Sequence, residues 1–177
     1  MAKLSPRQVY RLQVQREQVK KAIRGSCLLP RLDCLDLGIE DGHSGALMEE
    51  YSDGYIVGVD AYPPVCRDAP TCYDLVVCMD ALEFMRRCHS TFDMIVAAEL
   101  VEHYHKDTGL ALLGQIMEKG RAAIVTTPLG FMRQGEIKGN PYQVHKSGWN
   151  PEDFSDRGWE VPVVSEEQRL IVATWGI

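Results

Sequence analysis

The stretch "LDLGIEDGHSG", residues 35–45, joins an apolar run to a turn that contains three glycines. Asp36 lies near the end of the apolar run, and Gly38, Gly42 and Gly45 follow it. Glycine lets the backbone come close to a ligand, and a helix that begins after such a turn presents free N–H groups. A P-loop is excluded because no Lys-Ser or Lys-Thr pair follows. The pattern predicts a strand, a tight turn and a helix, and it leaves open whether the turn binds a nucleotide.

Short apolar runs recur along the chain on both sides of this turn. They are rich in Val, Ile and Leu and nearly continuous, which is typical of strands covered on both faces. The runs are 32–37, 55–60, 74–79, 92–98 and 122–127. Most of them are separated by segments with a helical pattern. These segments are 44–52, 81–88 and 106–120. Strands that alternate with helices predict βαβ units and a parallel sheet.

The C-terminal end breaks this alternation. After a short helix near residues 151–157 come "WEVPVV" and "RLIVATWGI", with only residues 165–168 between them. Four residues are too few for a helical crossover, so the two runs should pair antiparallel. The sequence therefore predicts an α/β fold with a seven-stranded sheet, mostly parallel, that ends in an antiparallel strand.

The N-terminal segment differs in charge from the rest of the chain. Residues 1–29 are expected to form a basic flanking helix, and residues 30–177 a single domain. The first 24 residues carry seven Lys/Arg against one Glu, a balance of +6, whereas the other 12 basic and 24 acidic residues give −12. We expect the basic side of this helix to be solvated, with a patch for an anionic ligand as the alternative. Its predicted apolar face is Val9, Leu12, Val19 and Ile23.

The overall composition is that of an ordinary globular chain. The 177 residues are 45% hydrophobic and 25% charged, without an apolar run long enough to span a membrane. The N-terminus lacks the apolar core of a signal peptide, and the six cysteines form no C-x-x-C pair, so we expect a cytoplasmic protein with reduced thiols. The spacing of Cys66, Cys72 and Cys78 matches no common zinc site. The acidic body argues against nucleic-acid binding.

Acidic residues stand at the ends of three predicted strands, where an open parallel sheet binds ligands. Asp60 can accept hydrogen bonds from two ribose hydroxyls, or it can cap the next turn. Asp80, followed by Ala81, can accept from an exocyclic amine, or it can cap the next helix. Glu99 is placed to face the ligand crevice.

A possible metal site follows the fourth strand. Glu102, His103 and His105 lie close together in sequence. No further ligand stands at a suitable spacing, so we expect no metal site here.

Residues 128–149 form a long connection with four glycines, two prolines and no regular period. Such a loop is usually a lid or a binding loop. His145 is the candidate catalytic base because an imidazole titrates near neutrality, and the alternative is a packing histidine bonded to the backbone. Tyr142 and Trp149 are expected to line an acceptor pocket, or to pack the loop.

In combination, these features resemble the class I S-adenosylmethionine-dependent methyltransferases over residues 30–177. "LDLGIEDG" is similar to the family pattern D-x-G-x-G-x-G, "VGVD" and "MDALEF" to its second- and third-strand acids, and "FDMIVAAELVEH" to its fourth motif. The resemblance implies a Rossmann-like, doubly wound fold with S-adenosylmethionine as cofactor. The cofactor contacts that it implies are Asp36, Gly38, Gly42, Asp60, Asp80, Ala81 and Glu99. The chain departs from the pattern at Glu40, where the family has glycine.

The resemblance also implies methyl transfer, and we expect a small molecule or a glycan as acceptor. Two alternatives remain. The first is a non-catalytic domain of the same fold that serves as a partner or scaffold, which Glu40 supports. The second is an NAD-binding Rossmann enzyme, which Glu40 and the antiparallel end both disfavour. The sequence leaves the acceptor and the oligomeric state open.

Overall fold

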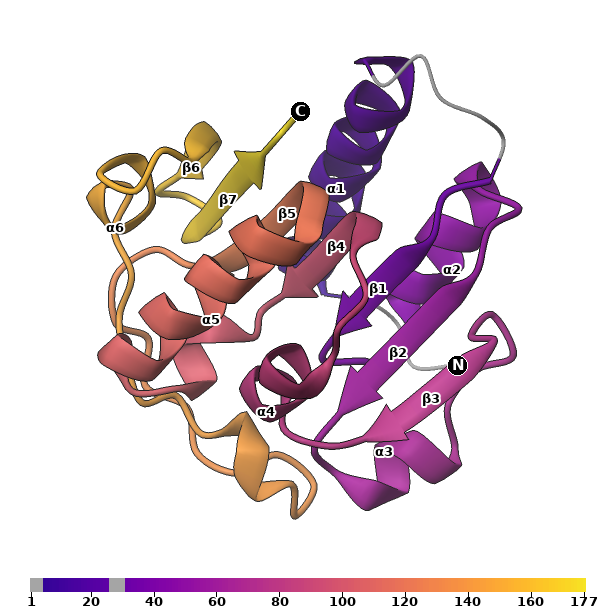
Figure 1. Cartoon of the computed structure of the whole chain (residues 1–177). Coiled ribbons are helices and arrows are strands. Elements are labelled where there is room, and N and C mark those ends of the chain that lie inside the picture. The colour runs from indigo at the N-terminus through magenta and orange to yellow at the C-terminus, as the bar shows by residue number, and fades with distance from the viewer. Residues whose placement is uncertain (1–4, 26–30) are drawn as a thin grey trace.

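A seven-stranded sheet organises the computed structural model, which describes residues 5–25 and 31–177 (Figure 1). The parallel strands are β1 (Cys34–Leu37), β2 (Ile56–Asp60), β3 (Leu75–Cys78), β4 (Phe92–Ala98) and β5 (Gly120–Pro128). The terminal hairpin consists of β6 (Glu160–Ser165) and β7 (Leu170–Trp175), and β7 pairs antiparallel with β5. The order β3-β2-β1-β4-β5-β7-β6 confirms the predicted fold class.

The strand order reverses at β1, which has β2 on one side and β4 on the other. Leu37 pairs in register with both Val59 and Ala97, so β1, β2 and β4 end nearly level. Residues that directly follow these strands therefore meet at one edge of the sheet. Ligands bind at such a switch point in open α/β sheets.

Helices cover both faces of the sheet (Figure 1). On one face, α4 (Ala81–Arg87) and α5 (Lys106–Lys119) pack on the sheet and bury the larger core cluster. On the other face, α1 (Pro6–Gly25) and α2 (His43–Tyr51) bury the second cluster. The predicted helices over 44–52, 81–88 and 106–120 correspond to α2, α4 and α5. The predicted short helix after residue 150 corresponds to α6 (Glu152–Ser155).

Three short elements had no counterpart in the sequence analysis. They are α3 (Pro63–Arg67), η1 (Val101–His103) and η2 (Pro141–Gln143). Each is too short to show a 3.6-residue period, so no pattern could indicate it. Both 3₁₀ turns lie in or beside the segments that form the site, and η2 lies within the ordered 128–149 connection.

The buried face of α1 differs from the predicted one. Val9 is 41% exposed, only Val19 of the described predicted residues is buried, and the side chain of Ile23 lies outside the described part of the chain. The buried residues of α1 are Arg11, Gln15, Val19 and Ala22. Two of these, Arg11 and Gln15, are polar, although Tyr10 and Val14 from the same half of α1 pack against the second core cluster. The expectation of a fully solvated basic side was therefore wrong for Arg11.

Strand β3 was expected to be covered on both faces, and it is not. It stands at the edge of the sheet, where Leu75 and Cys78 are exposed. Among the other thiols, Cys34 and Cys72 are buried, and Cys27 lies outside the described residues. No helix within residues 5–25 and 31–177 is long and apolar enough to cross a membrane.

Candidate functional site

The carboxyl ends of the parallel strands open into one cavity, which we call the strand-end cavity. It encloses about 750 Å³ of empty space, including solvent at its mouth. Six residues that were predicted to contact ligands line this cavity. They are Gly38, Asp60, Asp80, Ala81, Glu99 and Tyr142. The other predicted residues do not line this cavity. His145 lines a second cavity, which is described below, and Asp36, Gly42 and Trp149 line neither of the two.

The glycine turn after β1 has a left-handed backbone at both glycines and also at Glu40. Gly38 and Gly42 have φ angles of 85° and 76°, and Glu40 between them has a φ of 48°. A side chain at Gly42 would also place Cβ 2.4 Å from Cγ of Pro70. Glu40 therefore occupies a conformation that favours glycine, at some cost in strain. Its side chain is exposed and lies against the strand-end cavity.

Asp36 supports the turn from inside the core and does not line the strand-end cavity. Its side chain is fully buried, and the Tyr73 hydroxyl donates to its Oδ2 at 2.6 Å. The Tyr73 ring fits there because Gly45 has no Cβ: one would meet Tyr73 Cζ at 2.4 Å. Burial raises the pKa of the Asp36 carboxyl to about 7, although the hydrogen bond from Tyr73 opposes that shift. The resemblance implied that Asp36 contacts the cofactor directly. In the structure Asp36 is buried and does not line the strand-end cavity.

Replacing Tyr73 with phenylalanine should lower the free energy of unfolding by about 1–3 kcal/mol, the cost of leaving a buried acceptor unpaired. The pKa of Asp36 is raised above its unfolded value, so the folded state loses stability as pH rises from about 4 to about 7. Above that range the carboxyl is ionised and depends most on its donor. We therefore expect a larger loss at pH 8 than at pH 5.5, measured by urea unfolding. Tyr55→Phe, at an exposed tyrosine, is the matched control; equal losses at the two pH values would contradict this reasoning.

Asp60 joins the end of β2 to the glycine turn. Its Oδ1 accepts from the Tyr62 N–H at 2.8 Å, and its Oδ2 accepts from the Glu40 N–H at 3.3 Å. Partial burial raises the pKa of this carboxyl. The turn-capping role is thus present. A ribose role remains compatible with it because each carboxylate oxygen has a second lone pair.

Asp80 caps α4 and also faces the strand-end cavity. Its Oδ1 accepts from the Glu83 N–H at 3.0 Å, and its Oδ2 accepts from the Tyr104 hydroxyl at 2.7 Å. The N-cap alternative is therefore realised, and Ala81 follows directly on the cavity wall. Tyr104 was missed because it follows η1, in a distant part of the sequence.

A second cavity lies beside the first, between the start of α1, η1 and the 128–149 connection. We call it the α1-side cavity. The residues on its wall include Arg7, Arg11, Gln134, Glu102 and His145. It shares Glu40, Glu99, His103 and Gln143 with the strand-end cavity. A ligand in one cavity would therefore lie next to a ligand in the other.

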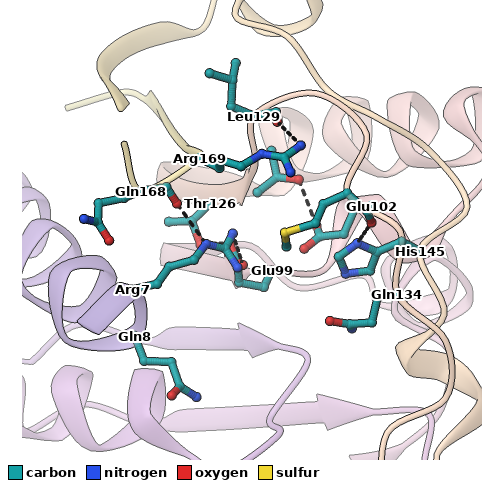
Figure 2. Close-up of polar contacts among 12 residues, drawn as sticks. Arg7, Gln8, Glu99, Glu102, Thr126, Leu129, Gln134, His145, Gln168 and Arg169 are labelled. Carbon is teal, nitrogen blue, oxygen red and sulfur yellow. Dashed lines mark hydrogen bonds and ion pairs between the residues drawn. The ribbon is translucent and has the colours of Figure 1, made fainter. Parts of the chain in front are cut away.

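Arg7 places a cation at the boundary of the two cavities. Figure 2 shows its guanidinium directed from α1 toward Glu99, with Nη2 2.6 Å from Glu99 Oε2. Its Nε also donates to the Gln168 carbonyl at 3.1 Å. Glu99 has a φ of 53°, a strained value for a non-glycine residue, and such residues cluster at functional sites. Arg7 is thus partly solvated and paired, and no pattern in the sequence pairs it with Glu99.

His145 is buried, and its Nδ1 lies 2.6 Å from the Met132 carbonyl oxygen. This contact is the backbone-bonded alternative that the sequence allowed. The His145 ring lies 5.0 Å from the His103 ring, between centroids. Burial lowers the pKa of both histidines, to about 4 for His103. Burial, followed by the charge of Glu99, raises the pKa of the neighbouring Glu102 well above its usual value.

Tyr142 and Trp149 have different positions. Tyr142 is 48% exposed and lies on the wall of the strand-end cavity, where it can contact a ligand. Trp149 is 0% exposed and packs against Phe154 in the core. The expectation that Trp149 lines an acceptor pocket was wrong, because the 128–149 connection returns to the core at its last residue.

Comparison with known proteins gives similarity in structure only. No protein-family model and no curated protein sequence matches the chain. A magnesium protoporphyrin IX methyltransferase from Synechocystis PCC 6803, solved with bound SAM, has a TM-score of 0.63 at 13% identity, over 98% of this chain and 85% of its own. A S-adenosylmethionine-dependent methyltransferase from Clostridium acetobutylicum ATCC 824 has 0.68 at 10% identity, over 89% and 87%. The N-terminal domain of EvdMO1, solved in the presence of SAH and D-fucose, has 0.65 at 16% identity, over 92% and 81%.

These similarities extend over nearly the whole chain and include many other solved structures. They agree with the strand order and with the antiparallel β7. The chain has the fold of the class I S-adenosylmethionine-dependent methyltransferases.

Proposed function

We propose that the protein transfers a methyl group from S-adenosylmethionine to a small-molecule or glycan acceptor. The observation that carries this proposal is the strand-end cavity, which gathers the glycine turn, Asp60, Asp80 and Glu99 on one wall. Structural neighbours solved with SAM or SAH support the choice of cofactor.

In this proposal each strand end binds one part of the cofactor. The Asp60 carboxylate accepts from the ribose hydroxyls, and Asp80 with Ala81 lies at the adenine. The turn at Gly38 lets the backbone approach the amino-acid part of the cofactor. Glu40 lies on both cavity walls, so its carboxylate can pair with the cofactor's ammonium group. Such a pairing would make the substitution of glycine an adaptation.

The acceptor then binds in the α1-side cavity. The shared wall of Glu99, His103 and Gln143 places this cavity next to the proposed cofactor position. Methyl transfer is an in-line displacement at the sulfonium methyl, so alignment of the two ligands is the main contribution of the protein. A base role for His145 would use Nε2, because Nδ1 faces the Met132 carbonyl. The neighbour solved in the presence of D-fucose supports an acceptor of sugar type.

Calorimetry with the full chain tests the cofactor. We expect one molecule of S-adenosylmethionine to bind per chain and NAD to give no heat. The reasons are that a structural neighbour was solved with bound SAM and that β7 is antiparallel. A folded protein that binds neither ligand would contradict the proposal, and heat from NAD alone would favour the NAD-binding Rossmann alternative. A screen of sugars and small hydroxylated molecules with methyl-labelled cofactor then separates an enzyme from a non-catalytic domain, which would bind the cofactor without transferring label.

A further inference from the structure

Three buried side chains on the wall of the α1-side cavity form a cluster with metal-ligand chemistry. Glu102, His103 and His145 each offer one ligand atom, and these three atoms lie within 4.8 Å of one another. Glu102 is 1% exposed and both histidines are 8% exposed. Two imidazoles and one carboxylate are a common ligand set for divalent transition metals.

The Nδ1 atom of each histidine and one oxygen of Glu102 have hydrogen-bond partners, as the ligands in metal sites do. Nδ1 of His103 lies 3.3 Å from a backbone carbonyl oxygen, and Nδ1 of His145 lies 2.6 Å from another. When each Nδ1–H donates to its carbonyl, the lone pair is left on Nε2 of both rings. Metal-binding histidines almost always donate their other N–H in this way. Glu102 is oriented too, because Thr127 Oγ1 donates to its Oε2 at 2.9 Å.

Glu102 also has an oxygen that the protein leaves unpaired. Its Oε1 is buried and has no hydrogen-bond partner among the described residues. A buried carboxylate oxygen without a partner costs free energy, so its position calls for a ligand. An electropositive ligand satisfies it directly.

The backbone fixes the distance between His145 and the other two residues. The N–H groups of Lys146 and Ser147 both donate to the Glu102 carbonyl, at 2.8 and 3.2 Å. The 128–149 connection is therefore anchored on η1 directly after His145. This anchoring brings together ligands that are far apart in sequence.

We propose that Glu102, His103 and His145 bind a divalent first-row transition metal ion such as Zn²⁺, Mn²⁺ or Co²⁺. Bonds of about 2.0–2.2 Å require the three ligand atoms to move together by about 1 Å. Glu99 lines the same cavity and adds a second carboxylate, which Arg7 pairs with in this structure. The inference reverses the expectation of no metal. The sequence had suggested His105 as the third ligand, and His105 is exposed and outside the cluster.

An ion with three protein ligands keeps open coordination positions. If the proposed function holds, these positions lie beside the methyl donor and can bind an acceptor oxygen, which lowers the pKa of that oxygen. This role in binding the acceptor rests on the proposed function. The metal site itself does not.

The test uses the full chain, treated with EDTA, dialysed and free of S-adenosylmethionine. Titration with CoCl₂ should give visible absorption bands of protein-bound Co²⁺ that saturate at one ion per chain. ZnCl₂ should displace the Co²⁺, because zinc binds the same N/O ligands. His145→Ala should weaken Co²⁺ binding at least about 100-fold, since even partners behind the ligands contribute 10–100-fold. His105→Ala, next to the cluster in sequence, should leave the affinity unchanged within about twofold.

Two further measurements keep the result unambiguous. His145→Gln replaces the ligand with a polar side chain and should lose the Co²⁺ bands while thermal melting shows a folded protein. Thr127→Val should keep the bands and weaken binding about tenfold. A folded wild-type chain without Co²⁺ bands would overturn the proposal, as would equal effects of His105→Ala and His145→Ala. Calorimetry with S-adenosylmethionine in EDTA reports on the cofactor separately, so the two proposals can fail independently.

Discussion

Replacing Trp149 with alanine is expected to lower the free energy of unfolding by about 3–5 kcal/mol, as for other large buried aromatics. The side chain is 0% exposed, and its ring centroid lies 5.3 Å from that of Phe154. It also packs on Gly109, where a Cβ would come within 2.6 Å of Trp149 Cζ2. Its Nε1 donates to Ser147 Oγ at 3.0 Å, and Lys106 Nζ lies 4.0 Å from the ring centroid. Truncation would leave a cavity and unpair a buried hydroxyl. Urea unfolding followed by circular dichroism measures the loss.

Tyr142→Ala is the matched control, because this aromatic belongs to the same connection and is largely exposed. We expect it to change stability by no more than about 0.5 kcal/mol. Trp149→Phe keeps a ring in the core and should lose less than the alanine variant, which guards against a variant that does not fold. A loss below 1 kcal/mol for Trp149→Ala would show that Trp149 is not a core residue and would restore a role in ligand binding.

Trp149 also shows the limit of reasoning about loops from sequence. The residue type and its place in a long connection suggested a ligand contact as readily as a packing contact. The outcome depends on where the connection returns to the core, and that is set by residues outside it. Gly109 in α5 provides the space for the indole ring. No local pattern in residues 128–149 carries this information.

The sheet, in contrast, was predictable. Buried strands need continuous apolar residues, and β1, β2, β4 and β5 show them. Strand β3 has the same pattern although it is exposed at the edge of the sheet. The four residues 165–168 allow only an antiparallel return, which is what β6 and β7 make. The face of α1 was not predictable in the same way. Helical-face arguments assume that apolar residues point inward, and α1 instead buries Arg11 and Gln15.

The candidate site likewise has a part that the sequence predicts and a part that it does not. Residues that directly follow parallel strands must meet at one edge, so the meeting of Gly38, Asp60, Asp80 and Glu99 follows from chain order and strand direction alone. Partners that come from other elements could not be found this way. Arg7 reaches Glu99 from the start of α1, and His145 reaches Glu102 through backbone hydrogen bonds of the long connection. Both contacts depend on packing that no spacing rule describes.

Asp60→Ala should weaken binding of S-adenosylmethionine at least tenfold, about 1.4 kcal/mol. In the proposed complex the carboxylate accepts from two adjacent ribose hydroxyls, and the alanine variant removes both interactions. The substitution also removes the acceptors for the Glu40 and Tyr62 N–H groups, which would loosen the turn beside the cofactor. Calorimetric titration of the folded variant with S-adenosylmethionine measures the change in Kd.

Asp60→Asn separates these two effects. Asparagine keeps one oxygen that can accept from the Tyr62 N–H, so the turn should persist while a ribose hydroxyl loses its charged acceptor. We expect an affinity between those of the wild type and Asp60→Ala. Asp53→Ala, at an exposed carboxylate before the opposite end of β2, should bind the cofactor as the wild type does. If Asp60→Ala binds with unchanged affinity, Asp60 only supports the turn, and recognition of the cofactor must then rest on Asp80 and Glu99.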